Sequence, residues 1–563
     1  MSLPTLSSGR RPANAALAFM PEGYSTQHGK LMGRQSATEG FLRAMIRHAG
    51  VDRHVAYALA PQAMASFAPM VRALGGRAPV SVIAPDNIAA LGEIGTLLLP
   101  QPNIGAQAGL RALARAERAF SITGITHTLA SRAVMAGIAE LVSQPVQDWD
   151  AVVCTSHSAR AVMTGLLAAE ENRLAQRLGA SRFTRPRLPI IPLGIDTASF
   201  VFPPAMRAQW RASIGAGPDD FVLLHHGRVS WHAKAHHWPM LAALGRVSAG
   251  MAPGRRLHLL VAGWSSNEGQ EAALRAQAAA ICPNVTLHRA GGLQPERRPG
   301  IWAAADAFTL LADNIQETFG LAVVEAMAAG LPVLVSDWDG FRDTVRDGQD
   351  GFRIPSLMAA PGAAPDLAMA HGAGAMDYDH FLAATTQLVA IDIAATTAAL
   401  EKLVLDAPAR RAMGGAAQAR ARGEFDWARI IPRWQALWTE LRAVREHATD
   451  TPPRPWPHPA LADPTQLFAA WPSAHLQPET RLARDPAAPA IGLAAALNLP
   501  AAIHPKADAA TAARLARLLA AAPEQGSITA QALHDAMPEA ERILAGRGML
   551  WLLKTGFLRV VPG

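Results

Sequence analysis

The sequence predicts an α/β protein with two doubly wound parallel sheets that face a cleft, followed by a small, mainly helical module. Three observations support this fold class. Half of the 563 residues are apolar and 17% are charged, which is enough material for a large core. Short apolar runs alternate with helical stretches from residue 15 to about residue 200. The same alternation starts again at residue 221, after a connection that contains Pro and Gly.

The first alternation predicts a parallel sheet within residues 1–205. Its predicted strands are Ala15–Met20, His54–Leu59, Val80–Ala84, Ala119–Ile122, Ala151–Thr155 and Leu188–Leu193. The predicted helices between them are Ser36–His48, Gln62–Leu74, Gly109–Arg118, Leu129–Ser143 and Ser158–Leu178. Strands that alternate with helices of this length form parallel α/β sheets, because each crossover helix packs on a face of the sheet.

The second alternation predicts a similar sheet within residues 206–445. Its predicted strands are Phe221–His226, Leu257–Ala262, Val285–Arg289, Ala307–Leu311 and Pro332–Ser336. Residues 356–378 consist largely of small residues, Gly and Pro, and are predicted to form a long loop or an insertion. Three predicted helices close the unit: Phe381–Val404, Pro408–Arg422 and Trp427–Val444.

A proline-rich linker is predicted at residues 446–463, because the run Thr451–Pro459 favours a stiff, extended chain. The remaining residues, 464–563, are predicted to form an accessory module. Its end, Ser527–Gly563, has the pattern of two helices and a short strand at Phe557–Val561, typical of a winged-helix-like cap.

The charge distribution limits the classes of partner. The chain has a net charge of +7, and residues 1–215 hold 21 Lys and Arg against 12 Asp and Glu. Nucleic acid, an anionic membrane surface and an anionic substrate would each explain this excess. The basic part lacks an RNA-binding signature, a helix-turn-helix pattern and zinc-finger spacing, so nucleic acid is not favoured.

The two cysteines and the hydropathy pattern indicate the compartment. Cys154 and Cys282 lie far apart in sequence, which excludes a disulfide framework and a thiolate metal cluster and fits a reducing compartment. The apolar run after the basic start is too short for a signal peptide, and no apolar stretch reaches 18 residues. We therefore expect a cytoplasmic protein.

The most informative segment is NIQETFGLAVVEAMAAGLPVLVSD, residues 314–337. Glu317 to Gly320 is predicted to be a turn that leads into a helix. A glycine at a helix N-terminus lets backbone N–H groups approach a diphosphate, and the helix dipole favours that charge. Glu317 is expected beside the reacting group. Glu325, eight residues on, is expected where a ribose would offer paired hydroxyls. The alternative is an ordinary amphipathic helix with two glutamates.

A second segment, GRVSWHAK at residues 227–234, directly follows a predicted strand. The guanidinium of Arg228 and the ammonium of Lys234 suit a leaving group that gains negative charge. Lys234 is one of only five lysines in a chain with 52 Lys and Arg, so this position is expected to require an ammonium. The alternative interpretation is a solvated basic loop.

Together these segments are similar to the donor signatures of family 4 retaining glycosyltransferases with the GT-B fold, the glycosyl transferases group 1. The similar elements are Glu-x7-Glu followed by Ala-Gly-Leu-Pro-Val and Ser-Asp, and Gly-Arg-x-Ser-x-x-x-Lys. The resemblance covers about residues 15–445. It implies two Rossmann-like domains: an acceptor domain at 1–205 and a nucleotide-sugar donor domain at 206–445. It also implies transfer of a sugar from a UDP- or GDP-sugar with retention of configuration, with no metal and no further cofactor.

The resemblance implies a role for each matching residue. Residues expected at the chemical step are Glu317, Arg228, Lys234 and His127, which lies in the segment Thr126-His-Thr128. Residues expected to bind the donor are Gly29, Gly227, Phe319, Gly320, Leu321 and Glu325. Gly29 is only one glycine of the family's usual pair. A structural histidine remains the alternative for His127.

The resemblance leaves the acceptor open among a glycan, a lipid-linked glycan and a protein. Polysaccharide or lipid-linked glycan assembly fits the basic first domain best, because that charge suits peripheral contact with the inner face of an anionic membrane. Arg111, Arg115 and Arg118 are predicted on one helical face, which is either solvated or in contact with lipid or phosphate.

Two further patterns are predicted not to bind a metal. Asp148-Trp-Asp150 precedes a predicted buried strand, and Asp337-Trp-Asp339 belongs to the donor signature. The histidines His225, His226, His232, His236 and His237 have no glutamate or cysteine arranged beside them as zinc ligands. Two alternative functions remain: a glucan synthase or phosphorylase of the same fold, and a regulatory GT-B-like protein whose C-terminal module binds a partner or DNA.

Overall fold

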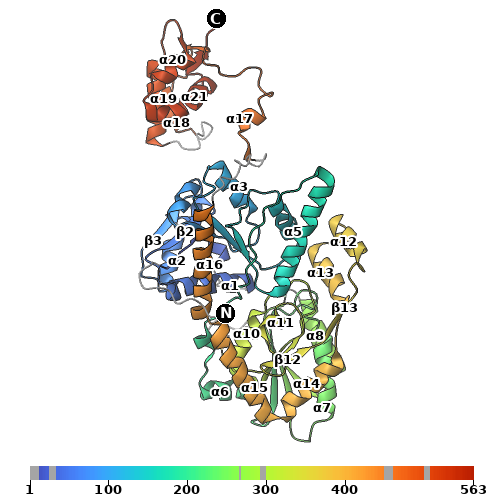
Figure 1. Cartoon of the computed structure of the whole chain (residues 1–563). Coiled ribbons are helices and arrows are strands. Elements are labelled where there is room, and N and C mark those ends of the chain that lie inside the picture. Colours follow the sequence, from blue (N-terminus) through green and yellow to red (C-terminus); the bar gives the residue numbers. More distant parts are fainter. Residues whose placement is uncertain are drawn as a thin grey trace. The chain divides into compact units, whose positions relative to one another are not determined.

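The computed structural model describes residues 12–24, 33–265, 268–291, 300–448, 461–499 and 508–562. The chain divides into two compact units, Met1–Leu461 and Ala462–Gly563. The larger unit contains two parallel sheets, each flanked by helices (Figure 1).

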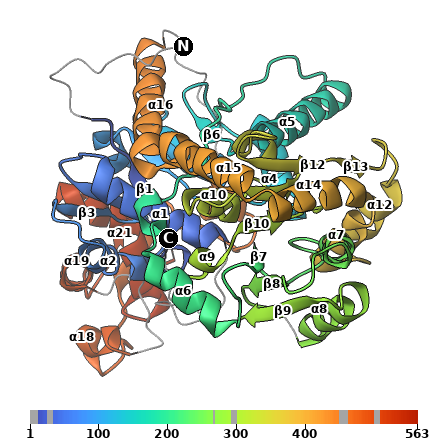
Figure 2. The ribbon, with the colours of Figure 1, turned by 90° about the horizontal axis from the view of Figure 1, so that it is seen from below.

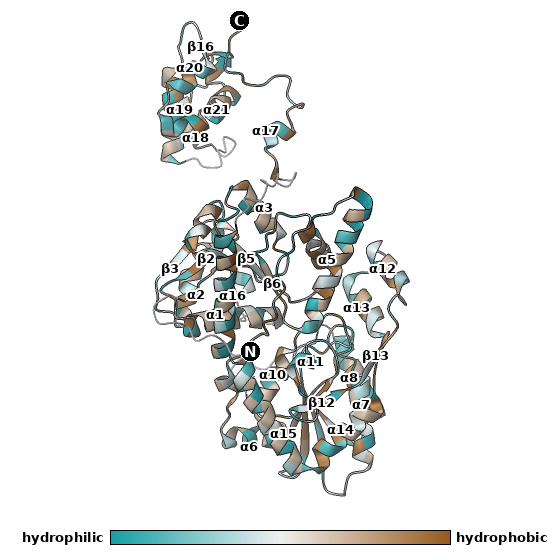
Figure 3. Cartoon of the chain, in the orientation of Figure 1, coloured by the Kyte–Doolittle hydropathy of each residue, from teal (hydrophilic) through white to brown (hydrophobic). Residues whose placement is uncertain are grey.

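The first sheet has six strands in the order β3-β2-β1-β4-β5-β6, and every neighbouring pair is parallel. Its strands are β1 (Ala16–Phe19), β2 (His54–Ala58), β3 (Val80–Ile83), β4 (Thr96–Leu98), β5 (Ser121–Ile125) and β6 (Ala151–Val153). The crossover helices are α1 (Gly33–His48), α2 (Phe67–Ala73), α3 (Gly105–Leu113) and α4 (Arg132–Ala139), and α5 (His157–Leu178) follows the last strand. The C-terminal part of α5 is polar, as its teal colour in Figure 3 shows. It pairs Arg173 with Glu170.

The predicted strand Leu188–Leu193 is wrong. This segment makes only isolated bridges, such as Cys154 to Ile190, because Pro189 and Pro192 cannot donate to a sheet ladder. The sixth strand is instead β4, which the sequence analysis missed. The predicted helix Gly109–Arg118 lies earlier in the chain, as α3 at Gly105–Leu113.

The predicted arginine face on this helix is also wrong. Arg111 is 1% exposed and forms two short hydrogen bonds with the buried carboxylate of Asp150, at 2.7 and 2.6 Å. Arg115 and Arg118 lie beyond the end of α3, and Arg118 donates to the backbone carbonyl of Arg445. Arg111 therefore holds the core together and is not available to lipid or phosphate.

The second sheet also has six parallel strands, in the order β12-β11-β10-β7-β8-β9. They are β7 (Phe221–His226), β8 (Leu257–Ala262), β9 (Val285–Ala290), β10 (Ala307–Leu310), β11 (Val333–Ser336) and β12 (Gly351–Ile354). The flanking helices include α6 (Pro204–Ser213), α7 (Trp238–Ala249), α8 (Glu268–Ile281), α9 (Ile301–Ala304), α10 (Leu321–Ala328), α11 (Phe341–Thr344), α14 (Ile393–Leu405) and α15 (Ala407–Arg420). Helices α7 and α14 pack against one another (Figure 2).

The segment expected to form a long loop or an insertion after this sheet is an ordered insertion. It consists of β13 (Ser356–Met358), α12 (Pro365–Gly372), α13 (Tyr378–Thr386) and β14 (Val389–Ile391). The predicted helix Phe381–Val404 is therefore wrong, since β14 separates α13 from α14. Strands β13 and β14 pair antiparallel and join the two ends of the insertion.

Helix α16 (Trp427–His447) leaves the second domain and packs on the first (Figure 1). It contacts α1 and β5, and it buries Trp434 and Trp438. The ring of Trp434 meets that of Phe41 in α1 edge to face, with centroids 5.3 Å apart. The first domain thus needs a helix from the far end of the larger unit to complete its core.

The smaller unit has its own core of residues from helices and strands, including Leu482, Leu515, Leu518, Leu533 and Leu552. Its helices are α17 (Pro464–Leu467), α18 (Gly492–Leu497), α19 (Ala509–Ala521), α20 (Ala530–Asp535) and α21 (Glu539–Lys554). Its strands β15 (Arg481–Arg484), β16 (Ile528–Thr529) and β17 (Leu558–Val560) form an antiparallel sheet in the order β16-β15-β17. The module is mainly helical, as predicted.

Candidate active site

The topology of the second sheet brings the two predicted donor segments together. Strands β7 and β10 are neighbours at the point where the strand order reverses, and their carboxyl ends share one edge. Ligands of doubly wound sheets bind at this point. Arg228 and Lys234 follow β7, and Glu317 follows β10, so the three side chains reach the same crevice.

Lys234 and Glu317 form the central contact of the site. Nζ of Lys234 donates to Oε2 of Glu317 over 2.6 Å, and both side chains are mostly buried. The other oxygen of Glu317 accepts from the backbone N–H groups of Thr318 and Phe319, at 3.3 and 3.5 Å. Burial alone would raise the pKa of Glu317, but the Lys234 ammonium and these hydrogen bonds hold it below its usual value. The carboxylate is therefore ionised at neutral pH.

The loop from Gly227 to Lys234 is held by its own contacts. Nη2 of Arg228 donates to the carbonyl of Ala233 and to Oε1 of Gln316, each at 3.2 Å. The amide of Asn314 donates to the carbonyl of Lys234 at 2.6 Å. A Cβ at Gly227 would lie 3.1 Å from Cε of Lys234, so a larger residue there would crowd the lysine.

The turn before α10 has the geometry expected from the sequence. Gly320 precedes the helix with φ of 92°, and a Cβ there would lie 2.3 Å from the ring of Phe341. The side chain of Phe319 is buried against Phe425, so only its backbone can face a ligand. Leu321 is the first residue of α10. The turn thus presents backbone N–H groups at a helix N-terminus, which favours an anion.

Glu325 lies further along α10 and lines a cavity formed by residues of both domains. Leu321 also lines this cavity, together with Arg43 and Arg47 of α1. Arg43 pairs with Glu39 and Arg47 pairs with Asp196. Burial raises the pKa of Glu325 to about 7. Glu325 is therefore partly protonated at neutral pH, unlike Glu317.

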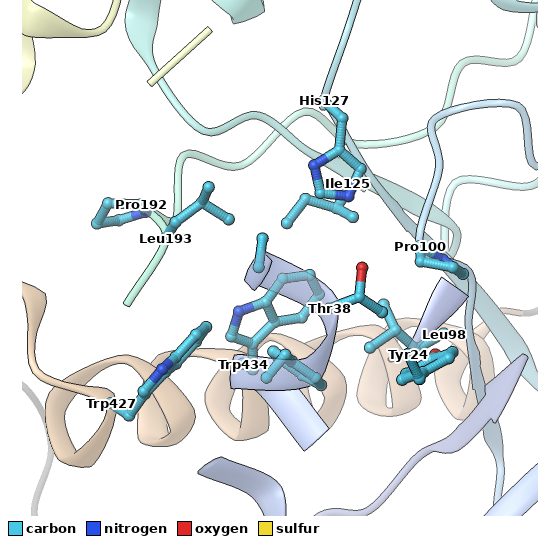
Figure 4. A pocket seen from close by; sticks show the side chains of 12 residues that line it. Tyr24, Thr38, Leu98, Pro100, Ile125, His127, Pro192, Leu193, Trp427 and Trp434 are labelled. Atoms are coloured by element: carbon cyan, nitrogen blue, oxygen red, sulfur yellow. The ribbon is translucent and has the colours of Figure 1, made fainter. Parts of the chain in front are cut away.

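His127 lies at the corresponding edge of the first sheet, just after β5. It lines a mainly apolar pocket with residues that follow β1 and β4, such as Tyr24 and Pro100 (Figure 4). Trp427 and Trp434 of α16 form another wall, and Thr38 and His127 supply its polar side chains. The structure thus places His127 at a small, mainly apolar pocket of the first domain. Gly29 lies outside the described residues.

The sequence analysis missed a group of residues at the N-terminus of α5. These residues contact the turn before α10 and the segment that follows β11. The hydroxyl of Thr155 donates to the carbonyl of Thr318 at 3.2 Å, and that of Ser156 donates to Asp339 at 3.3 Å. The backbone N–H of His157 donates to Asp343 at 2.7 Å. Polar residues between β6 and α5 were the only signal in the sequence, and their partners lie in another domain.

Asp339 is held in an unusual state. Its φ is 43°, and its Oδ2 is buried without a hydrogen-bond partner among the described residues. Burial and the nearby Glu317 carboxylate raise the pKa of Asp339 to about 8, so it is mostly protonated at neutral pH. Strained residues of this kind gather at functional sites.

Among the remaining acidic and histidine patterns, Asp150 and His232 have partners within the protein, whereas Nε2 of His225 and of His237 has none among the described residues. Asp150 pairs with Arg111, and His232 contacts Ser230 and Gln270. Within the part of the chain that the structure describes, no group of three or more His, Cys, Asp or Glu side chains is arranged to hold a metal ion.

The sequence comparisons support the donor half of the site. Residues 220–371 match the family described as Glycosyl transferases group 1, and this span includes Arg228, Lys234, Glu317 and Glu325. The D-inositol 3-phosphate glycosyltransferase of Nocardia farcinica is 31% identical over 199 residues, which is 34% of this chain and 41% of that protein. The phosphatidyl-myo-inositol mannosyltransferase of Mycobacterium leprae is 37% identical over 101 residues, 18% of this chain and 25% of that protein. The chain thus spans less than half the length of both relatives.

Solved structures share the fold. A glycosyltransferase of Rickettsia africae matches with a TM-score of 0.50 and 11% identity, over 76% of this chain and 98% of that one. HepE of Anabaena, solved in complex with UDP, matches with a TM-score of 0.48 and 16% identity, over 74% and 98%. The two parallel six-stranded sheets are the Rossmann-like domains of the GT-B fold, which confirms the predicted fold class. The larger unit thus has the GT-B fold.

Proposed function

We propose that this protein transfers a sugar from a nucleotide-sugar donor to a hydroxyl acceptor with retention of configuration. One observation carries the proposal. Arg228, Lys234 and Glu317 meet at the N-terminus of α10, at the switch point of the second sheet and within the matched family segment. Two cations and a helix N-terminus suit a diphosphate, and a carboxylate beside them suits the hydroxyls of a sugar.

The proposed chemistry needs no protein nucleophile. The bond between the anomeric carbon and the diphosphate oxygen breaks, and the acceptor oxygen bonds to the same face of that carbon. The acceptor proton passes to the departing diphosphate. Arg228 and Lys234 stabilise the charge that develops on the leaving group, while Glu317 and the Phe319–Leu321 backbone hold the sugar and phosphate. Glu325 would hold the ribose.

The pocket of Figure 4 supports a choice of acceptor. It lies at the switch point between β1 and β4 of the first sheet, where a doubly wound domain binds its ligand. Its walls are mainly apolar, with Trp427, Trp434 and Leu193 among them, while Thr38 and His127 are polar. An acceptor with an apolar part fits these walls. We therefore propose a lipid-linked acceptor in glycan or polysaccharide assembly.

Such an acceptor would bring the protein to a membrane surface. No helix among the described residues is long and apolar enough to cross a membrane. The excess of Lys and Arg in residues 1–215 supports peripheral binding to anionic lipid at the cytoplasmic face.

The test is a thermal-shift panel of UDP-, GDP- and ADP-sugars on the wild type, Lys234→Ala and Lys402→Ala. Lys402 is exposed on α14 and serves as the matched control. A donor at about 100 times its Kd should stabilise the native state by about 2.7 kcal/mol. We expect one nucleotide class to shift the wild type and Lys402→Ala but not Lys234→Ala. NMR of the product formed from that donor then shows whether the anomeric configuration is retained. Absence of a shift with every donor would contradict the proposal.

A further inference from the structure

The insertion formed by β13, α12, α13 and β14 lies against the donor site. Its first and last strands, β13 and β14, pair with each other, with Ser356 opposite Ile391 and Met358 opposite Val389. Helices α12 and α13 are held together by the ring of His371, which stacks on Phe381 with centroids 4.5 Å apart. The insertion is therefore an ordered element with a fixed attachment at the edge of the second domain (Figure 1).

The insertion contacts both domains beside the residues proposed to act on the donor. Leu382 of α13 is fully buried in a small cluster with Ala233 and Ala130, against which Tyr378 packs. Ala233 is the neighbour of Lys234, and Ala130 follows His127 by three residues. Nη1 of Arg132 donates to the carbonyl of Gly372 at 2.9 Å. The insertion thus joins the His127 loop to the Arg228–Lys234 loop.

The first turn of α13 turns polar groups towards the same loop. Oδ1 of Asp379 lies 4.0 Å from Nε2 of His232. The hydroxyl of Tyr378 is buried and has no hydrogen-bond partner among the described residues. Tyr378 packs against the cluster that contains Ala233, and Nη2 of Arg228 donates to the carbonyl of Ala233, so both side chains flank the same loop residue. In the part of the chain that the structure describes, only Nη2 of Arg228 donates to protein. The hydroxyl of Tyr378 and the other N–H groups of Arg228 can therefore each still donate a hydrogen bond.

We propose that Tyr378 of the insertion donates a hydrogen bond to the diphosphate of the nucleotide sugar, beside Arg228. This inference rests on the function proposed above and adds a donor-binding residue that lies outside both recognised segments.

The chemistry favours a diphosphate as the shared ligand. Phosphate oxygens only accept hydrogen bonds, and Tyr378 remains a donor because burial raises its pKa to about 12. A guanidinium and a hydroxyl side by side can each bind one oxygen of the same phosphate. The Asp379 carboxylate lies 4.0 Å from His232 and repels phosphate, which leaves the Tyr378 and Arg228 side for the anion.

The experiment measures nucleotide binding by calorimetry on the full chain. UDP, GDP and ADP are titrated first into the wild type to find the one that binds, and its monophosphate and its glucose or mannose conjugate follow. Tyr378→Phe removes only the hydroxyl. Tyr57→Phe is the matched control, since the hydroxyl of Tyr57 bonds to the carbonyl of Pro85 in the first domain. Thermal midpoints verify that both variants fold.

We expect Tyr378→Phe to weaken binding of the nucleoside diphosphate about tenfold, as loss of a hydrogen bond to a charged group does. The monophosphate and Tyr57→Phe should stay within about twofold of the wild type, which is below the effect of one such bond. If Tyr378→Phe binds the nucleoside diphosphate as tightly as the wild type, the inference about Tyr378 is overturned but the proposed function is not. An effect confined to the sugar conjugate would also overturn it, because the contact would then be to the sugar. If the wild type binds no nucleoside diphosphate, the proposed function fails and the inference with it.

Discussion

The ion pair between Lys234 and Glu317 satisfies two charges that the protein largely removes from water. The side chains are 22% and 14% exposed, so each charge depends on the other and on the backbone N–H groups beside Glu317. Removing one partner leaves the other charge without compensation. A bound phosphate would compete with Glu317 for Lys234. Before a nucleotide sugar binds, the ion pair holds the Lys234 ammonium in the place where the phosphate would lie.

We predict that Glu317→Gln lowers the free energy of unfolding by about 1–3 kcal/mol, the usual cost of a buried charged group that loses its hydrogen-bond partner. Lys234→Met should have a similar effect. The double variant should lose less than the sum of the two, because neither charge is then left unpaired. Urea denaturation of the four proteins at pH 7 measures this coupling. Strictly additive losses would show that the two side chains act independently.

Asp339 gives a prediction with the opposite pH dependence from an ordinary acidic residue. Its pKa of about 8 in the folded protein lies above its usual value of 3.8, so the folded state binds more protons than the unfolded state between these values. The contribution of Asp339 to stability therefore falls as the pH rises from about 4 to about 8. Asn has the same shape, cannot ionise and tolerates the φ of 43°.

We predict that the stability of Asp339→Asn relative to the wild type rises from pH 5 to about pH 8 and then levels off. The gap should grow by at most about 1.4 kcal/mol per pH unit. Glu325 and Asp313 also have pKa values of about 7, but they are common to both proteins and cancel in the difference. Denaturation curves from pH 5 to 9 provide the measurement. A difference that does not change with pH would contradict the raised pKa.

Residues whose chemistry shows in local sequence could be predicted, and residues that act across domains could not. Glu317 and Lys234 lie in short segments with characteristic spacing, and the structure brings them within 2.6 Å. Thr155 and Ser156 look like ordinary residues before a helix, because their partners lie more than 160 positions away. Arg111 was misread for the same reason: its buried partner, Asp150, is 39 residues distant.

At the level of elements, the turn before α10 requires a glycine at position 320 for two separate reasons. Gly320 has a positive φ, and a Cβ at this position would clash with the fully buried ring of Phe341, only 2.3 Å away. Gly348 provides a matched comparison, since its φ is 72° and nothing lies within 4 Å of its Cβ position. The backbone strain is shared by the two sites, whereas the steric clash belongs to Gly320 alone.

We predict that Gly348→Ala costs about 1–2 kcal/mol of stability, from the left-handed backbone conformation alone. Gly320→Ala should cost a further 1–3 kcal/mol, because the methyl group must displace packed side chains. It should also abolish nucleotide binding, which Gly348→Ala should keep. Denaturation and calorimetry on both variants test this. Equal stability losses would show that the turn can absorb the methyl group.

Elements with continuous apolar runs could be predicted from sequence, and short or interrupted ones could not. Phe221–His226 and Leu257–Ala262 are strands within the predicted bounds. β4 was missed although Leu97 and Leu98 are apolar, and β12 begins with Gly351 and contains Arg353, so it has no continuous apolar run. Residues 356–378 resemble a loop in composition, yet the pairing of β13 with β14 holds them as an ordered insertion.

At the scale of the whole molecule, the two domains of the larger unit do not correspond to continuous halves of the chain. Gln435 of α16 donates to the carbonyls of Ala13 and Ala49, and Arg445 donates to the carbonyl of Gly95. These contacts, with the buried Trp434 and Trp438, make α16 part of the first domain's core. A periodic pattern predicts the helix itself, but it carries no information on which sheet the helix covers.

This arrangement predicts how truncated chains behave. A chain that ends at residue 448 keeps α16 and every residue of the proposed donor and acceptor sites, so it should unfold cooperatively and bind the donor nucleotide with the affinity of the full chain. A chain that ends at residue 425 exposes the surface that Trp434 and Trp438 cover, and the loss of such side chains costs about 3–5 kcal/mol each. We expect it to aggregate or to melt without a cooperative transition.

Residues 462–563 alone should fold, because their core is internal to them. Circular dichroism melts and calorimetry on the three chains measure these outcomes. A chain ending at 448 that folds but binds the donor weakly would show that residues beyond 448 contribute to donor binding.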